Sequence, residues 1–316
     1  MLNGISMCYF EIYFNLVIIL TDLWTKKTEL EFFKESLDNA KTPEQLFYVT
    51  KDGRYLAYWP RDYKGPRTTL QSRNSLIGIF TEKWSKHIIQ KAIGNNDKLY
   101  AVRSAVCNEI ALTKRSPGDV VISRNKSVKQ RAEDIIVIFE IKMSVVWNWE
   151  YIKENRKSNR FKCIGDYKTH FGIPGMLRSD SMLKAIGKSV NIRISSPKAS
   201  QIPIIILGNT PITQSYYNKV DRLCKTGVIQ GFWSVNPEPL DCKNSKDNLK
   251  TTQKGGFYRF NSFEEFKNRI ISLYSQEKTF FSSMKSKKEL GKIIEIANKQ
   301  KTDEEKGKLF IRLIGE

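Results

Sequence analysis

The chain has 316 residues, of which 40% are hydrophobic and 27% charged, so its composition excludes a disordered protein and allows one large core or two modest ones. Its formal net charge of +20, from 53 basic and 33 acidic residues, favours a polyanionic partner, nucleic acid in particular. A Lys-rich composition of the kind found in some prokaryotic proteins is the alternative. Five scattered cysteines without a C-x-x-C pair, and two histidines, exclude zinc-site spacing and fit a reducing, prokaryotic cytoplasm.

The N-terminal part of the chain is first apolar and then aromatic and basic. Residues 1–20 lack a basic start and a small-residue cleavage site, and their apolar run is too short to span a bilayer, so we expect a packed strand or helix. Met7 is an alternative start to Met1. Residues 28–46 have helical spacing interrupted by a proline, which predicts two short helices. The aromatic and basic residues 55–67 either contact nucleic acid or form a plain packed loop.

Residues 75–93 carry the clearest helical pattern, with apolar side chains recurring at spacings of three and four. Asn74 is a candidate cap at the start, and Gly94 is expected to end the helix. Glu82 does not lie on the apolar stripe. It either approaches neighbouring structure on a second face of the helix or is a solvated partner of Lys86.

Two apolar, β-branched segments further along the chain predict a β-hairpin. Residues 120–123 and 135–143 would be its strands, with polar residues between them. A symmetric hairpin, centred midway between positions 129 and 130, places Asp119 opposite Glu140. Lys142 lies on the same side as Glu140, because residues two apart point to one face of a strand.

These three side chains suit metal-dependent phosphodiester chemistry. Two carboxylates are hard oxygen donors of the kind Mg²⁺ prefers, and the backbone carbonyl of Ile141 would be a third ligand. Lys142 would orient or deprotonate the attacking water, or offset charge in the transition state. The alternative is a surface hairpin in which Asp119, Glu140 and Lys142 form an ordinary cross-strand ion pair.

The second half of the chain contains a basic segment and several shorter elements. Residues 150–176 are polar and rich in lysine, arginine and glycine, which favours a DNA-contacting loop over plain solvated surface. Residues 202–207 are typical of a buried strand, joined to the hairpin by a parallel crossover. Two further expectations lie beside the hairpin: a strand over 99–112 that contains Glu109, and an extension or end of the hairpin strand over 143–149. Towards the C-terminus we expect helices over 215–224, 262–274 and 285–301 and strands over 228–235 and 309–314. Residues 237–256 are expected to form a loop.

Residues 179–190 predict the amphipathic helix of that crossover, with Ser179 or Asp180 as its cap. The stripe expected to face the core consists of Met182, Leu183, Ile186 and Val190.

The order Pro117, Gly118, Asp119, twenty intervening residues and then Glu140, Ile141, Lys142 resembles the PD-(D/E)XK motif of the restriction-endonuclease-like nucleases. The surrounding order of helix, three strands, helix and strand is similar to the core of that superfamily, and the resemblance covers residues 74–210. This chain departs from the motif in having Gly118 between the proline and the aspartate.

The resemblance implies an α/β fold with a restriction-endonuclease-like αβββαβ core, in which a central mixed sheet is flanked by helices and elaborated at both ends. It implies that Asp119 and Glu140 bind Mg²⁺ and that Lys142 is the catalytic lysine. Glu82 is the implied accessory acid, and Glu109 competes for that role. We expect one nuclease domain over residues 1–316, with an N-terminal elaboration (1–73), a catalytic core (74–236) and a C-terminal elaboration (237–316).

The implied activity is that of a type II restriction endonuclease, which cuts double-stranded DNA at a short sequence with Mg²⁺ and leaves 5′-phosphate and 3′-hydroxyl ends. A homodimer is expected for symmetric sites, together with a separate DNA methyltransferase of the same specificity. A junction-resolving or DNA-repair nuclease, or a non-catalytic basic DNA-binding protein, is the alternative. Basic residues in loops near aromatic or glycine residues are candidates for DNA contact: Arg61, Arg67, Arg73, Arg156, Arg160 and Lys168.

Overall fold

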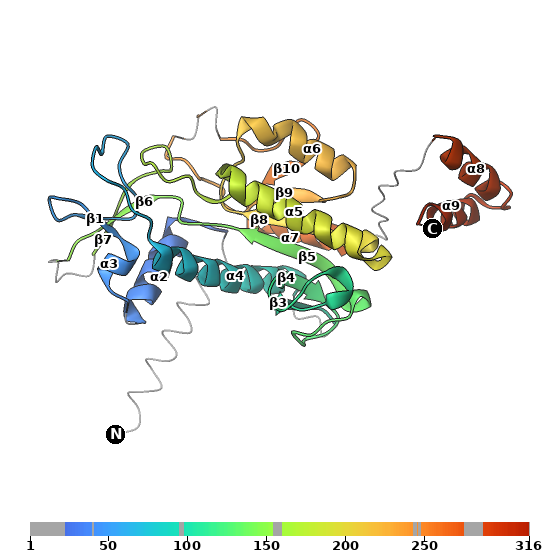
Figure 1. The fold of residues 1–316 in the computed structure, drawn as a ribbon, viewed down its shortest axis with the longest axis horizontal. Helices are drawn as coiled ribbons and strands as arrows, with labels where there is room; N and C mark the ends of the chain where they lie inside the picture. The colour runs from blue at the N-terminus through green and yellow to red at the C-terminus, as the bar shows by residue number, and fades with distance from the viewer. Residues whose placement is uncertain are drawn as a thin grey trace, which may run out of the picture.

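The computed structural model describes residues 23–39, 41–94, 98–153, 160–242, 245, 248–274 and 287–315. The fold is mixed α/β, with a six-stranded mixed sheet flanked by helices and a separate four-stranded sheet (Figure 1). The expected N-terminal element over residues 1–20 lies outside the described residues. Among the residues described, no helix combines the length and the apolar character that crossing a membrane requires.

The large sheet is parallel on one side of its fourth strand and antiparallel on the other. Its order is β10-β9-β8-β5-β4-β3, and β3, β4 and β5 pair antiparallel whereas β5, β8, β9 and β10 pair parallel. The strand β5 therefore has an antiparallel neighbour on one side and a parallel neighbour on the other. The strands are β3 (Tyr100–Ala105), β4 (Gly118–Ser123), β5 (Ile135–Lys142), β8 (Ile204–Gly208), β9 (Gly231–Ser234) and β10 (Phe257–Arg259).

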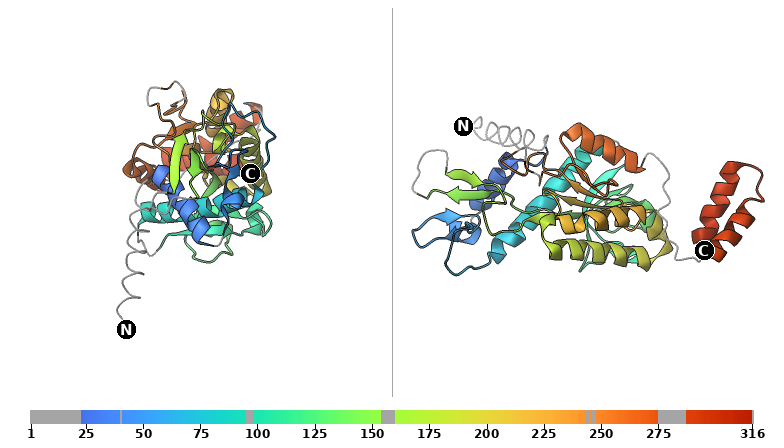
Figure 2. Two further views of the ribbon diagram at one scale, coloured as in Figure 1. Left: turned by 90° about the vertical axis from the view of Figure 1, so that its left-hand side faces the viewer. Right: turned by 90° about the horizontal axis from the view of Figure 1, so that it is seen from above.

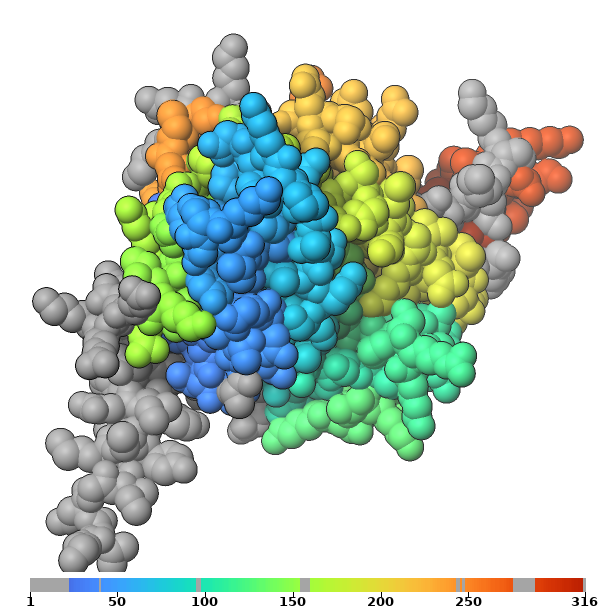
Figure 3. Space-filling view, turned by 60° about the vertical axis from the view of Figure 1, so that its left-hand side comes forward, coloured from blue at the N-terminus to red at the C-terminus, as the bar shows by residue number. Residues whose placement is uncertain are grey.

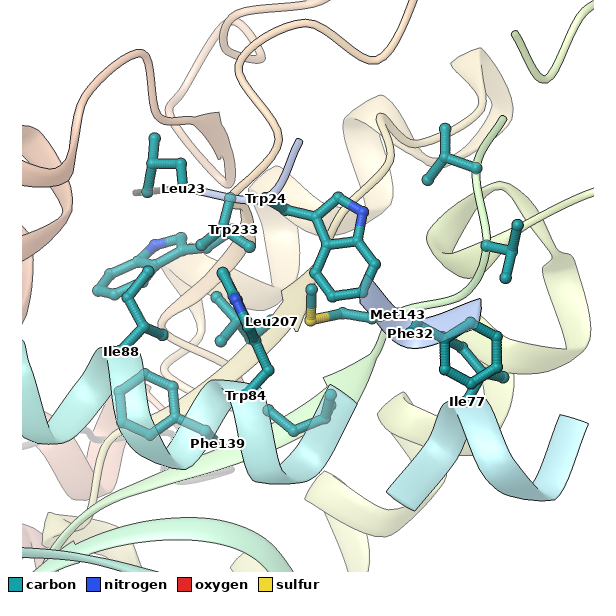
Figure 4. Packing of buried hydrophobic residues seen from close by; sticks show 14 of the residues in the cluster. Leu23, Trp24, Phe32, Ile77, Trp84, Ile88, Phe139, Met143, Leu207 and Trp233 are labelled. Atoms are coloured by element: carbon teal, nitrogen blue, oxygen red, sulfur yellow. The ribbon is translucent and has the colours of Figure 1, made fainter. Parts of the chain in front are cut away.

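Two helices cover each face of this sheet. Side chains alternate between the faces of a strand, so Phe139 of β5 packs with α4 (Gln71–Ile93) and α7 (Phe263–Tyr274), whereas Ile138 packs with α5 (Ser179–Ser195) and α6 (Tyr217–Lys225). The core on the first face is rich in tryptophan. Figure 4 shows Trp24, Trp84 and Trp233 around Phe139 and Leu207, and the rings of Trp24 and Trp84 meet edge to face at 5.3 Å.

The second sheet joins the N-terminal region to the basic segment that follows β5. It is antiparallel, in the order β1 (Tyr48–Val49), β2 (Tyr55–Leu56), β6 (Asn148–Tyr151) and β7 (Phe161–Gly165). The helices α2 (Lys26–Asp38) and α3 (Pro43–Leu46), which confirm the two expected short helices, pack against it.

The expectation of an irregular segment over 150–176 is therefore wrong in part, because β6 and β7 belong to this sheet. Of the two possibilities for residues 143–149, the end of the hairpin strand is correct, because β5 ends at Lys142 and β6 begins at Asn148. Aromatic packing explains the pairing, since Phe47 stacks on Tyr151 at 5.7 Å and Phe33 stacks on Phe161 at 6.1 Å.

The fully buried carboxylate of Glu29 holds α2 against the segment between β5 and β6. Its two oxygens accept hydrogen bonds from the backbone N–H groups of Val146 (2.6 Å) and Trp147 (3.2 Å). They also accept from the indole N–H groups of Trp24 (3.1 Å) and Trp149 (3.0 Å). Burial raises the pKa of Glu29 to about 7, although these donors act in the opposite direction.

Several predicted elements differ from the structure at their ends. The helix expected over 75–93 starts earlier, at Gln71, so Leu70 and not Asn74 is its N-cap, and it ends before Gly94, whose φ of 74° suits glycine. The strand expected over 99–112 ends at Ala105, and a 3₁₀ helix over Asn108–Ile110 follows it.

The C-terminal part contains one wrong assignment. The helix over 262–274 is confirmed as α7, and Glu265 N–H donates to Ser262 Oγ (3.2 Å) at its start. The basic helix over 285–301 corresponds to α8 (Lys287–Ala297). The strand expected over 309–314 is part of a helix, α9 (Asp303–Gly315). In Figures 1 and 2, α8 and α9 pack on each other and lie apart from the rest of the chain.

Candidate active site

The hairpin β4–β5 has the predicted register. Val120 lies opposite Phe139, and Val121 lies opposite Ile138. The same register carried one residue further places Asp119 beside Glu140. A β-bulge between Ile122 and Ser123 shifts the pairing only at the far end, next to the turn.

Three oxygen atoms converge on the ammonium of Lys142 at the end of β5. Its Nζ lies 2.6 Å from Glu140 Oε1, 3.2 Å from the carbonyl oxygen of Ile141 and 4.0 Å from Asp119 Oδ2. Asp119 Oδ2 also accepts a hydrogen bond from the backbone N–H of Ile141 (2.7 Å), which fixes that carboxylate against β5. A cation therefore fits among the three oxygens expected to be metal ligands.

The donor set suits Mg²⁺ in kind, because all three atoms are hard oxygens and Mg²⁺ is bound in proteins by one or two carboxylates with water and phosphate. Within the described part of the chain, no group of three or more His, Cys, Asp or Glu residues is placed to hold a metal ion. If a metal ion binds at this site, Asp119, Glu140 and the Ile141 carbonyl would hold it through these three oxygens.

A second lysine, Lys188 of α5, completes the site and was missed by the sequence analysis. Its Nζ lies 2.5 Å from Glu140 Oε2 and 3.1 Å from Asp119 Oδ1. It also donates to the backbone carbonyl of Pro117 at 2.7 Å. The site therefore contains two carboxylates and two ammonium groups, drawn from β4, β5 and α5.

The wrong helix phase explains why Lys188 was missed. The expected stripe included Leu183 and Val190, but Leu183 is 61% exposed and Val190 39% exposed. The residues of α5 that face the sheet are Met182, Ala185, Ser189 and Ile192. Lys188 follows Ala185 by three and precedes Ile192 by four, so the correct phase turns it toward the hairpin. The cap is also different, since Arg178 and neither Ser179 nor Asp180 occupies it.

The start of α5 is held against the ends of β5 and β8 by a close backbone approach. Gly175, at φ 55°, lies so near that a Cβ would sit 3.1 Å from the carbonyl oxygen of Lys142 and 2.9 Å from Thr210 Oγ1. The next residue, Met176, donates its N–H to Thr210 Oγ1 at 2.9 Å. This contact fixes where the helix that carries Lys188 begins.

Burial and repulsion between like charges change the pKa of Glu140. Burial, and then the negative charge of Asp119, raise the pKa of Glu140, whereas Lys142 and Lys188 oppose that rise. Burial alone would lower the pKa of the Lys188 ammonium, but attraction to Asp119 and Glu140 outweighs it and raises that pKa. The ion pairs of Lys188 thus keep its ammonium charged and offset the repulsion between the two carboxylates.

Of the two candidate accessory acids, only Glu82 has a pKa that the charges of the site influence. Glu82 of α4 is half-buried, and burial followed by the charge of Asp119 raises its pKa. Glu109 is bound elsewhere: its carboxylate pairs with Lys198 at 2.6 Å and accepts from the backbone N–H of Ala132 at 3.3 Å. The influence of the Asp119 charge on Glu82, together with the separate ion pair of Glu109, favours Glu82 for the accessory role.

For the Mg²⁺-dependent DNA cleavage that the resemblance implies, we expect Glu82→Ala to lower the rate by about 10–100-fold, the usual effect of losing a group that supports metal ligands. Glu109→Ala, which removes a surface ion pair, is expected to leave the cleavage rate within about twofold of the original. Initial rates on a supercoiled plasmid measure both. The reverse result, with Glu109→Ala inactive and Glu82→Ala active, would assign the accessory role to Glu109.

The candidate DNA-contacting residues have different surroundings. Arg61, Arg67, Arg160 and Lys168 are exposed. The guanidinium of Arg67 lies over the ring of Phe171 at 4.2 Å, and Lys168 Nζ lies 3.2 Å from Ser245 Oγ. Arg156 lies outside the described residues.

Arg73 does not fit its expected role. It is only 3% exposed, donates to the carbonyl oxygen of Ala57 and packs over the ring of Tyr58 at 4.8 Å, so it is a structural residue beneath the second sheet.

The end of β5 thus carries a compact charged site, which α5 covers. It consists of Asp119, Glu140, Lys142 and Lys188. The space-filling view shows the region of α5 (yellow) beside the N-terminal residues (blue and cyan), with the part of the chain between about residues 100 and 140 (green) below them (Figure 3). No protein-family model, curated protein or solved structure matches this chain. Its function is therefore inferred from the geometry and chemistry of the site.

Proposed function

We propose that this chain is a Mg²⁺-dependent endonuclease of the PD-(D/E)XK kind that hydrolyses phosphodiester bonds of double-stranded DNA. One observation carries the proposal: Glu140 Oε1, the Ile141 carbonyl oxygen and Asp119 Oδ2 surround a single cationic nitrogen at the end of a buried strand. An ordinary surface ion pair does not account for this, because Glu140 is 6% exposed and its neighbours in β5 are apolar.

The order of the elements supports the same proposal. The chain runs α4, β3, β4, β5, α5 and β8, with β5 and β8 parallel, which is the order expected of an αβββαβ core. The strands β6 and β7 are inserted between β5 and α5 and belong to the other sheet. The site lies where that core would carry it, on β4 and β5.

Each residue has a role that follows from its position. Asp119, Glu140 and the Ile141 carbonyl would hold Mg²⁺, which when bound supplies Lewis acidity that activates water and offsets charge on the scissile phosphate. Lys142, whose Nζ lies 2.6 Å from Glu140 Oε1, would orient the attacking water or offset charge in the transition state. Glu82, whose pKa is raised in part by the charge of Asp119, would be the accessory acid of the site.

The substrate follows from the charge of the whole chain. A net charge of +20 attracts duplex DNA, and exposed arginines near the N-terminal loops are available for its backbone. We propose the type II restriction class, acting as a homodimer in which each subunit cuts one strand of a symmetric site and leaves 5′-phosphate and 3′-hydroxyl ends. A methyltransferase that modifies the same site would protect the host DNA.

Incubation of the purified chain with phage and plasmid DNA, with Mg²⁺ or with EDTA, tests the proposal. Discrete fragments that appear only with Mg²⁺ are the expected result. Cleavage confined to branched or damaged DNA would indicate a junction-resolving or repair nuclease with the same chemistry. DNA binding without cleavage of any of these substrates would show a non-catalytic binding protein and contradict the nuclease proposal.

A further inference from the structure

Lys188 is the only described residue that contacts both site carboxylates closely through one atom. Its Nζ lies 2.5 Å from Glu140 and 3.1 Å from Asp119, whereas the Nζ of Lys142 is close to Glu140 but 4.0 Å from Asp119. Two carboxylates facing each other across neighbouring strands repel. Lys188 therefore bridges the pair closely, whereas Lys142 reaches Asp119 only at 4.0 Å.

The bridge uses the same carboxylates that a metal ion would require. Lys188 engages Glu140 Oε2 and Asp119 Oδ1, and Lys142 engages Glu140 Oε1. Because the side chain of Lys188 is only 17% exposed, water screens these interactions little. Binding of a divalent cation thus has to compete with an ammonium that is already in place.

We propose that Lys188 is a positioning residue that holds Asp119 and Glu140 together in the absence of metal and that a divalent cation displaces from them. This inference rests on the metal site of the proposed nuclease. Once displaced, the ammonium stays at the site, because α5 is fixed at its start by Gly175 and Met176. It is then free to contact a phosphate oxygen of the substrate.

The inference has a thermodynamic signature that a purely structural lysine would lack. Without metal, loss of Lys188 leaves Lys142 alone to offset the repulsion between the buried Glu140 and the partly buried Asp119, which destabilises the fold. When metal is bound, the cation takes over the role of the bridge, so the stability lost with Lys188 is regained. A structural lysine would contribute equally under both conditions.

The test compares Lys188→Met with the original chain by calorimetric titration of MgCl₂ and MnCl₂ and by thermal unfolding in EDTA or metal, all without DNA. We expect Lys188→Met to bind the metal about tenfold more tightly, since a neighbouring positive charge and a competitor are both removed. Its unfolding temperature is expected to fall in EDTA and to recover in metal by more than that of the original chain. Lys188→Arg, which keeps the charge, is expected to retain the original metal affinity.

Lys184→Met is the matched control, because Lys184 lies one turn earlier on α5 with its side chain 78% exposed, and its loss removes the same charge. It is expected to change neither metal affinity nor the response of the unfolding temperature to metal. If Lys188→Met does not fold in EDTA, Lys188→Gln, which keeps one donor, takes its place.

Equal metal affinity in Lys188→Met and the original chain, or an equal loss of stability with and without metal, would overturn the inference. Neither measurement involves DNA or turnover. A chain that cleaves no DNA but shows the metal-linked difference would contradict the proposed activity alone, and a chain that cleaves DNA without that difference would contradict the role of Lys188 alone.

Discussion

Asp119→Asn and Lys142→Ala are each expected to lower the rate of Mg²⁺-dependent DNA cleavage by about a thousandfold, since several kcal/mol of charge stabilisation depends on them. Asp119→Asn replaces an anionic oxygen that would hold the ion, and Lys142→Ala removes the group that would orient water. Neither change removes an apolar core side chain, so the fold is expected to persist. Single-turnover cleavage of a plasmid, with circular dichroism as a check on folding, measures the effect.

Lys198→Ala is the control for these variants, because Lys198 is an exposed lysine whose partners are Glu109 and Glu133 on the surface. It is expected to cleave at the original rate. DNA binding of Asp119→Asn and Lys142→Ala in a gel-shift assay should remain within about tenfold of the original, since most of the affinity of basic proteins for DNA comes from many phosphate contacts. Full cleavage by both variants would remove the site from the mechanism.

The second large effect concerns stability. Glu29→Ala is expected to lower the free energy of unfolding by about 3–5 kcal/mol, because it leaves four N–H donors without a partner in the interior. Urea unfolding followed by tryptophan fluorescence measures this loss. Glu31→Ala, on the same helix but paired only with Lys34 at the surface, is expected to cost less than about 1 kcal/mol.

The same carboxylate gives the fold a pH dependence of definite sign. The pKa of Glu29 is raised to about 7 in the folded protein, above its ordinary value of 4.5, so the folded state holds this proton more tightly than the unfolded state. The resulting stability is fully present below about pH 4.5 and is lost as the pH rises through about 7. Glu29→Gln, which cannot ionise, should lack this decline. An unchanged slope in that variant would assign the decline to other groups.

The hairpin was predictable from sequence because the composition of its strands and the register set by its turn point to the same pairing. Both strands are β-branched and apolar, and a symmetric turn fixes their register, so Asp119, Glu140 and Lys142 fall on one face. The long helix before the hairpin was predictable for the same reason, since apolar side chains recur along its length. Its start was missed because residues 71–74 carry no apolar side chain to mark it.

Lys188 and the second sheet depend on tertiary packing that local sequence does not encode. In α5 the stripe containing Leu183 and Val190 is as apolar as the stripe that faces the sheet, so the phase is undetermined until the neighbouring strands are known. Short strands such as β6 and β7 give weak signals. The apolar run of α9 fits a strand as well as a helix, because a short run has no clear period.

The β-bulge between Ile122 and Ser123 separates two parts of the hairpin that can change independently. On one side the pairing of β4 with β5 is fixed by burial, and a slip by one residue would carry Asp119 to the opposite face of the sheet. On the other side the bulge takes up a change of register, so the contacts of residues 124–134, among them the hydrogen bond from Ser123 to Gln130, do not set the register at the site. The position of Asp119 opposite Glu140 is thus set by the buried part of the hairpin and not by its turn.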